Sequence, residues 1–185
     1  MNIPEIFKYG TIISAPLFLG VSLLLIKRLP DFSFSKHTIS KSVLFIDNRF
    51  LKTIFRLNFV IKALLDFGFV LYLANKLEIT NNFIVLPLFL TPVFFISLSY
   101  FIEGKYNFWH RTLAYCSGAS WIVGQVLLAF FTKNIIFIIF TIIISAAVSA
   151  LTLLSILKRK VNIVVQLAYS ILLYLWLLVF VFKFL

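Results

Sequence analysis

The sequence predicts an all-α integral membrane protein, built as a bundle of six transmembrane helices. Of the 185 residues, 62% are hydrophobic and only 12% are charged, whereas soluble domains are about half apolar and about a quarter charged. The mean hydropathy is +1.08. The apolar residues form continuous runs, not the alternating apolar and polar pattern of a transmembrane β-strand. We therefore expect a single helical membrane domain over residues 1–185.

A helix that spans a bilayer needs about 17–25 predominantly apolar residues. Such runs are predicted over residues 9–26, 54–74, 83–102, 109–131, 134–157 and 162–182. Lys27 and Arg28 directly follow the first run. A cleavable signal peptide has the opposite charge order, so we expect this helix to be retained. Pro87 and Pro92 should bend the third helix.

The first connection, residues 27–53, is the only long one. Residues 40–53 show helical periodicity, with Ser40 as a candidate N-terminal cap. Two interpretations stay open. Residues 40–53 form a short helix that lies in the membrane interface, or they continue the second span into the headgroup region.

The distribution of Lys and Arg predicts the orientation in the membrane. The first, third and fifth connections share one side and carry eleven basic residues: Lys27, Arg28, Lys36, Lys41, Arg49, Lys52, Lys105, Arg111, Lys158, Arg159 and Lys160. The other side carries four: Lys8, Lys76, Lys133 and Lys183. We expect this basic side in the cytoplasm and both termini outside. Charges scattered at helix ends argue against nucleic-acid binding and favour attraction to anionic lipid headgroups.

Small residues recur at four-residue spacing in the fourth and fifth predicted spans. The pairs are Ala114 and Gly118, Ser120 and Gly124, Ser145 and Ser149, and Ala146 and Ala150. Such spacing allows helices in a membrane to approach closely. These faces could serve packing within the bundle or a homo- or hetero-oligomer.

Asn58, Lys62 and Asp66 place polar groups on one stripe of the second span. An ionised side chain at the centre of a transmembrane helix costs about 2.5–3.5 kcal/mol on insertion scales. One interpretation is a buried site that binds a polar headgroup or relays a proton. The other is a structural pair of Lys62 with Asp66, with Asn58 bonded to a neighbouring helix.

The fourth span carries a second polar face, made by His110, Ala114, Ser117, Trp121 and Gln125. His110 is interpreted either as an acid–base group or headgroup contact, or as a residue of the interfacial aromatic belt with its polar tip in water. Ser117 and Gln125 are expected to form hydrogen bonds between helices.

His37 and Ser40 lie in the first connection, on the same predicted side as His110. A Ser and a His can act as nucleophile and base, so the candidate catalytic residues are His37, Ser40, Asp66 and His110. The candidate ligand-binding residues are Asn58, Lys62, Asp66, His110 and Ser117. The two His, one Cys and six carboxylates show no recognised metal-ligand spacing. We expect no metal and no cofactor.

Three features together resemble the DRAM-type membrane families: the long first connection with His37 and Ser40, Asn58 in the second span, and His110 at the start of the fourth. The similarity covers about residues 27–131 and extends to uncharacterised prokaryotic six-helix relatives. It implies a six-helix bundle in a prokaryotic plasma membrane, and its eukaryotic members imply lipid handling. In those members the first connection is expected on the lumenal side, the reverse of the orientation that the charges predict here.

The first functional hypothesis is therefore a bundle that binds a lipid headgroup at an intramembrane polar site. The alternatives are an intramembrane lipid-modifying hydrolase or transferase, a small transporter, and an accessory subunit of a membrane complex. No internal repeat of the transporter kind is present in the sequence.

Overall fold

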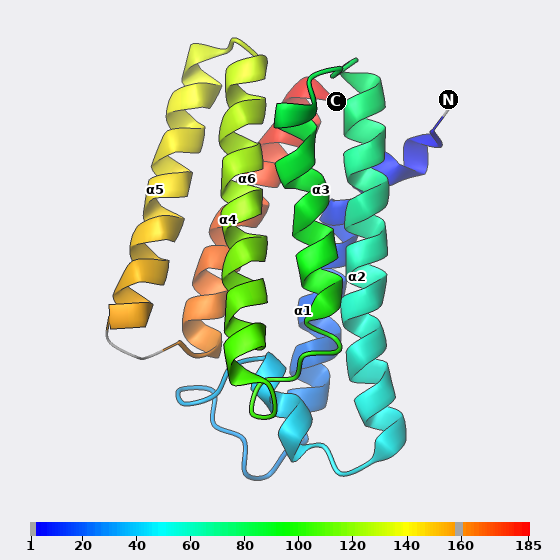
Figure 1. Cartoon of the computed structure of the whole chain (residues 1–185), viewed down its shortest axis with the longest axis vertical. Coiled ribbons are helices and arrows are strands. Elements are labelled where there is room, and N and C mark those ends of the chain that lie inside the picture. Colours follow the sequence, from blue (N-terminus) through cyan, green and yellow to red (C-terminus); the bar gives the residue numbers. More distant parts are fainter. Residues whose placement is uncertain (1–2, 158–160) are drawn as a thin grey trace.

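Helices are the only regular structure in the described residues, 3–157 and 161–185, of the computed structural model (Figure 1). The main helices are α1 Gly10–Ile26, α2 Arg49–Lys76, α3 Asn82–Ser97, α4 Asn107–Phe131, α5 Ile135–Leu157 and α6 Ile163–Phe184. The 3₁₀ helix η1, Glu5–Tyr9, leads into α1, and a second, η2, spans Ser40–Phe45. Five helical segments are long and apolar enough to cross a membrane, and α3 is a shorter apolar helix. The predicted all-α membrane bundle is confirmed.

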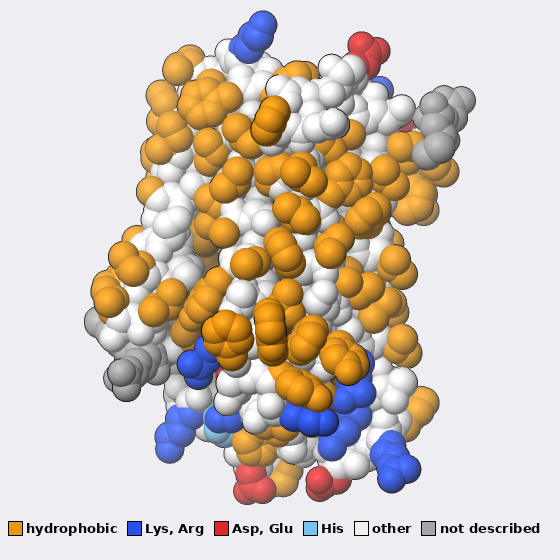
Figure 2. All heavy atoms as spheres, in the orientation of Figure 1, with side chains coloured by type: hydrophobic (Ala, Val, Ile, Leu, Met, Phe, Trp, Pro, Cys, Tyr) orange, Lys and Arg blue, Asp and Glu red, His pale blue; other side chains and the backbone are white. Residues whose placement is uncertain are grey.

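Each helix packs against the next along the chain, and α6 returns to contact α1, so that the helices form a ring. Both termini lie at one end of the bundle (Figure 1). The connections after α1 and α3 lie at the other, where Lys and Arg side chains gather (Figure 2). We call this second end the basic end. Gly10 allows α1 to lie close to α2, because a Cβ at this position would fall 2.5 Å from the Leu65 carbonyl oxygen.

The structure corrects the expected end of the third span. α3 ends at Ser97, not at residue 102. The backbone N–H groups of Ser99 and Tyr100 donate to carbonyl oxygens three residues earlier, so the chain tightens into turns. Residues 98–106 then run across the basic end and lead into α4.

Residues 40–53 do not form one interfacial helix. Ser40–Phe45 is a separate 3₁₀ helix, and Ile46 is extended. The Asn48 side chain then caps α2 by accepting from the backbone N–H groups of Phe50 and Leu51, at 2.8 and 3.2 Å. The last part of the predicted helix therefore belongs to α2, because this cap starts the second span at Arg49.

The apolar core consists of two clusters. The far-end cluster lies toward the end opposite the basic end and includes Phe69, Leu73, Leu88, Leu128, Phe137, Trp176, Leu177 and Phe180. The basic-end cluster includes Phe18, Ile26, Ile39, Val43, Phe55, Phe59, Leu98 and Ile163. The candidate site lies between the two.

Candidate functional site

A cavity of about 330 Å³ occupies the interior of the ring. Its wall is made by residues of α1, α2, α3, α4 and α6, with Ile39 and Ser40 at the basic end. Phe18 and Phe59 come from the basic-end cluster, and Leu177 comes from the far-end cluster. The cavity is therefore a gap between two well-packed regions of the bundle.

Five of the seven candidate site residues line this cavity: Ser40, Lys62, Asp66, His110 and Ser117. They come from three separate parts of the chain. Helical periodicity placed Lys62 with Asp66, and His110 with Ser117, but it could not show that the two stripes face the same space. His37 and Asn58 are not among the lining residues.

Lys62 and Asp66 form an ion pair one helical turn apart in α2. Asp66 is only 3% exposed, and its Oδ1 also accepts a 2.6 Å hydrogen bond from the Ser14 hydroxyl of α1. The Lys62 ammonium lies 4.8 Å from the centre of the Phe95 ring, which favours a cation. Each charge thus has a partner, although a buried pair of this kind is weak support for stability.

The Lys62 ammonium keeps donor capacity for a ligand. An ammonium group has three N–H donors, and Asp66 is its one hydrogen-bond acceptor among the described residues. Thr11, which also lines the cavity, is 5% exposed, and its hydroxyl has no hydrogen-bond partner within residues 3–157 and 161–185. Unsatisfied buried polar groups are costly, so the cavity offers hydrogen-bonding groups that a polar ligand can satisfy.

Asn58 has a structural position. Its side-chain N–H group donates to the Phe18 carbonyl oxygen at 2.9 Å and to the Ser22 hydroxyl at 3.1 Å. Both acceptors lie in α1. The amide thus joins α2 to α1 beside the cavity, as the interhelical interpretation of Asn58 expected.

His110 is buried, with 4% of its surface exposed. The interpretation as a belt residue with its tip in water is therefore wrong. Its Nδ1 lies 2.6 Å from the Phe101 carbonyl oxygen, and because a carbonyl oxygen only accepts, Nδ1 carries a proton. Its Nε2 lies 3.9 Å from Glu103 Oε2. The early end of α3 makes this possible, because residues 98–106 fold back over the imidazole.

The first connection is tied to the rest of the basic end. Thr38 donates a hydrogen bond to Glu103, and the Ile39 backbone N–H donates to the Gln166 side chain of α6 at 2.8 Å. Gln166 also lines the cavity. Gln166 was not among the residues predicted from the sequence, although an amide inside an apolar span was a usable signal.

His37 lies in the first connection and is not among the residues that line the cavity. Its ring packs against Phe32 and Phe45, with centroids 5.1 and 4.8 Å away. Partial burial lowers the pKa of His37, the charges of Lys41 and Lys36 lower it further, and Glu103 opposes them. His37 therefore does not share the cavity that His110 lines.

Ser117 and Gln125 were both expected to bond neighbouring helices. The Ser117 hydroxyl donates to the Thr91 backbone oxygen of α3 at 3.2 Å. Gln125 is fully buried, and neither atom of its amide has a partner within the described residues. The expectation for Gln125 is therefore wrong.

The chain matches no protein-family model, and no curated protein and no solved structure is significantly similar to it. The interpretation of the site rests on the geometry of its own residues.

Proposed function

We propose that the protein binds the headgroup of a membrane lipid inside the helix bundle. Lys62, Asp66, His110 and Ser117 are the proposed contacts. The observation that carries this proposal is their shared position around one cavity of about 330 Å³. Ligand pockets commonly have about 300–1,000 Å³ and a mostly apolar wall with a few polar groups, and this cavity has both features.

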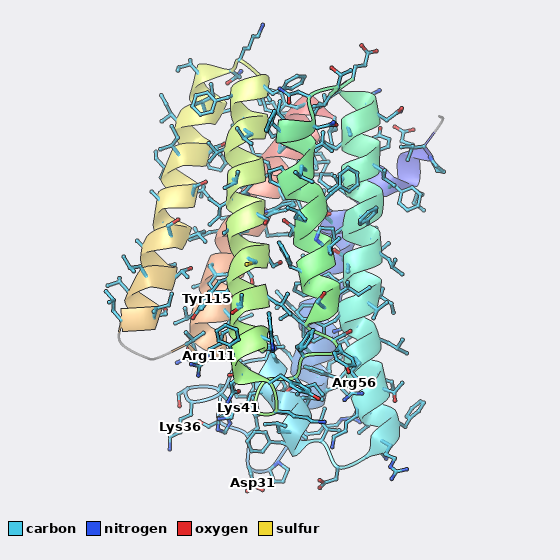
Figure 3. The ribbon with its side chains drawn as sticks, viewed as in Figure 1. Asp31, Lys36, Lys41, Arg56, Arg111 and Tyr115 are labelled. Atoms are coloured by element: carbon cyan, nitrogen blue, oxygen red, sulfur yellow. The ribbon has the colours of Figure 1, made fainter. Side chains whose placement is uncertain are left out.

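An anionic headgroup fits the charges best. Lys62 and Asp66 compensate each other, and the spare N–H donors of Lys62 favour a carboxylate or phosphate oxygen as ligand. Lys36, Lys41, Arg56 and Arg111 all lie at the basic end (Figure 3). A positive surface of this kind attracts anionic lipids. By the same Lys and Arg distribution, we propose that the basic end faces the cytoplasm and both termini lie outside.

The test is native mass spectrometry of the protein purified in a mild detergent. Wild type should carry a co-purified lipid. The double variant Lys62→Met/Asp66→Leu should lose it, because the ammonium that binds the headgroup is gone. Both charges leave together, so no unpaired charge remains to unfold the bundle. Lys52→Met/Asp47→Leu makes the same changes near the start of α2, outside the cavity wall, and should keep the lipid.

Two results would contradict the proposal. One is a wild-type spectrum without bound lipid under conditions that preserve the fold. The other is equal lipid occupancy in Lys62→Met/Asp66→Leu and the matched control.

A second candidate is an intramembrane enzyme that modifies the bound lipid. The observation in its favour is that Ser40 and His110 both line the cavity, while the Phe101 carbonyl oxygen orients the imidazole. Ser40 would be the nucleophile and His110 the base of an acyl transfer. A screen with labelled phospholipids should then show turnover that Ser40→Ala and His110→Gln each abolish. Turnover that survives both substitutions would reject this candidate.

A further inference from the structure

The weakest junction of the ring is the seam between α1 and α6. These helices share the least extensive contact of all the neighbouring pairs around the ring. Pro16 of α1 and Ile171 of α6 line the cavity and are also exposed. The cavity therefore reaches the lipid-facing surface of the bundle at this seam.

A proline shapes the seam. Pro16 has no backbone N–H, so the Ile12 carbonyl oxygen lacks its usual helical donor. The Tyr174 hydroxyl of α6 donates to this oxygen at 3.2 Å. Within the described residues it is the one side-chain hydrogen bond that joins α1 to α6. Pro16 thus leaves a free acceptor on α1 beside the cavity, and Tyr174 bonds to it across the seam.

The route along the bundle axis is closed at the basic end. Besides the Ile39–Gln166 bond, the Ile163 backbone N–H donates to the His37 carbonyl oxygen at 3.0 Å. The Asn162 side chain donates to the Ser35 carbonyl oxygen at 2.9 Å. The first connection is thereby fixed to the start of α6. A lipid that approaches along the axis would have to break several hydrogen bonds, whereas one that arrives through the seam meets a single one.

We propose that the ligand is a one-chain amphiphile with an anionic headgroup, and that it enters sideways from the bilayer through the Tyr174-held seam between α1 and α6. This inference rests on the proposed lipid-binding function and specifies the class of lipid. A cavity of about 330 Å³ lies at the lower limit of ligand pockets. It suits one chain, and the second chain of a phospholipid would have to stay outside it. The carboxylate of a fatty acid and the phosphate of a lysophospholipid offer the same chemistry to Lys62.

The ligand class is tested by adding palmitic acid, lysophosphatidylglycerol or two-chain phosphatidylglycerol separately to the delipidated protein. Native mass spectrometry then reports the occupancy. The two lipids with one chain should bind, and their relative occupancy distinguishes a carboxylate from a phosphate ligand. Phosphatidylglycerol carries the same headgroup as its lyso form, so equal binding of the two would overturn the one-chain class.

The route is tested by exchange of bound lysophosphatidylglycerol for a deuterated copy, followed over time. Tyr174→Phe removes only the hydroxyl, and exchange should become about threefold faster or more, because hydrogen bonds between membrane helices have modest strength. Tyr100→Phe makes the same change at a residue that is 70% exposed and outside the cavity wall, and it should exchange like wild type. Equal rates in all three proteins would overturn the role of Tyr174.

A reversible crosslink tests the route independently. α1 and α6 are antiparallel, and Ile12 meets Tyr174, so Ala15 and Ile171 lie one turn further at the same level of the seam. Ala15→Cys and Ile171→Cys, with Cys116→Ser to remove the native thiol, can be joined by a cleavable bifunctional thiol reagent. Exchange should stop in the joined protein and resume after reduction. Continued exchange in the joined protein would overturn the sideways route.

Failure of the route and failure of the function give different results. If the one-chain lipids bind but neither Tyr174→Phe nor the crosslink changes the exchange rate, only the inference about the route is rejected. If neither one-chain lipid binds and wild type carries no co-purified lipid, the lipid-binding function itself falls.

Discussion

The far-end half of this bundle is closed, whereas the cavity begins beside it and extends toward the basic end, although both regions have similar apolar walls. In the far-end cluster, the rings of Trp176 and Phe180 stack at 5.2 Å, and the Phe137 ring lies 5.6 Å from Trp176. The Trp176 indole N–H donates to the Thr141 hydroxyl at 2.7 Å, and that hydroxyl donates to the Phe137 carbonyl oxygen. Large rings fill this half, and its tryptophan and threonine are satisfied within the bundle.

The half toward the basic end uses its polar groups differently. Lys62, His110 and Ser117 each have a partner in the protein, but all three also face the cavity. The comparison teaches that hydropathy does not distinguish the two halves. The difference lies in whether the polar side chains contact only other protein groups or also face open space.

The largest effect should come from separating the ion pair. Asp66→Leu leaves the Lys62 ammonium without its acceptor in the membrane interior, and we expect a loss of about 3–5 kcal/mol of stability. Lys62→Met/Asp66→Leu should recover most of it, because neither charge remains. Unfolding in mixed micelles measures both proteins. A double variant as unstable as the single one would mean that the pair holds the cavity half together.

A large side chain placed in the cavity should weaken lipid binding without loss of stability. Gly118 lines the cavity, and a Cβ there would have no atom within 4 Å. Gly118→Leu should therefore fill ligand space and weaken lysophosphatidylglycerol binding about tenfold or more, equivalent to about 1.4 kcal/mol.

Gly20 provides the matched control. It is also helical and has no atom within 4 Å of an added Cβ, but it does not line the cavity. Gly20→Leu should bind like wild type in the same native mass spectrometry titration. If both substitutions weaken binding equally, the cavity is not the lipid site.

Gln125 is an exception to the satisfied polar groups of the closed half, since neither of its amide atoms has a partner within residues 3–157 and 161–185. Gln125→Leu removes this amide at similar volume, and we expect a gain of about 1 kcal/mol. Ser117→Ala, which removes a satisfied hydroxyl, should give no gain. Midpoints of thermal unfolding rank the two variants. A loss of stability in Gln125→Leu would show that the amide stabilises the bundle.

The smallest effect should be a pH dependence at His37. Its pKa is lowered in the folded protein by partial burial and by Lys41 and Lys36, whereas the unfolded value is about 6.5. The unfolded chain therefore binds more protons in acid. The contribution of His37 to stability is therefore complete above about pH 6.5, the unfolded pKa, and declines as the pH falls from there toward the lower pKa of the folded protein.

Thermal unfolding of wild type and His37→Gln between about pH 8 and about pH 5 measures this effect. The variant should lose less stability on acidification than wild type. Parallel curves for the two proteins over the whole range would assign the pH dependence to other groups.

Much of the fold could be predicted because a bilayer restricts the solutions. Each backbone polar group must be satisfied within its own segment, so a long apolar run becomes a helix. Periodicity also placed Asp66 beside Lys62, and His110 on the same face as Ser117. The end of α3 at Ser97 was not predicted, because the turns that stop it are stabilised by a contact with His110 farther along the chain.

The sequence by itself determined the membrane class, the apolar helices and the unusual charge at Asp66, because composition and helical period are local properties. Only the tertiary structure decided that Asp66, His110 and Ser40 share one cavity while Asn58 and His37 do not. It also decided that Pro16 leaves an acceptor for Tyr174 across the α1–α6 seam. Both depend on which helices become neighbours and how they are rotated, and packing over the whole chain sets these.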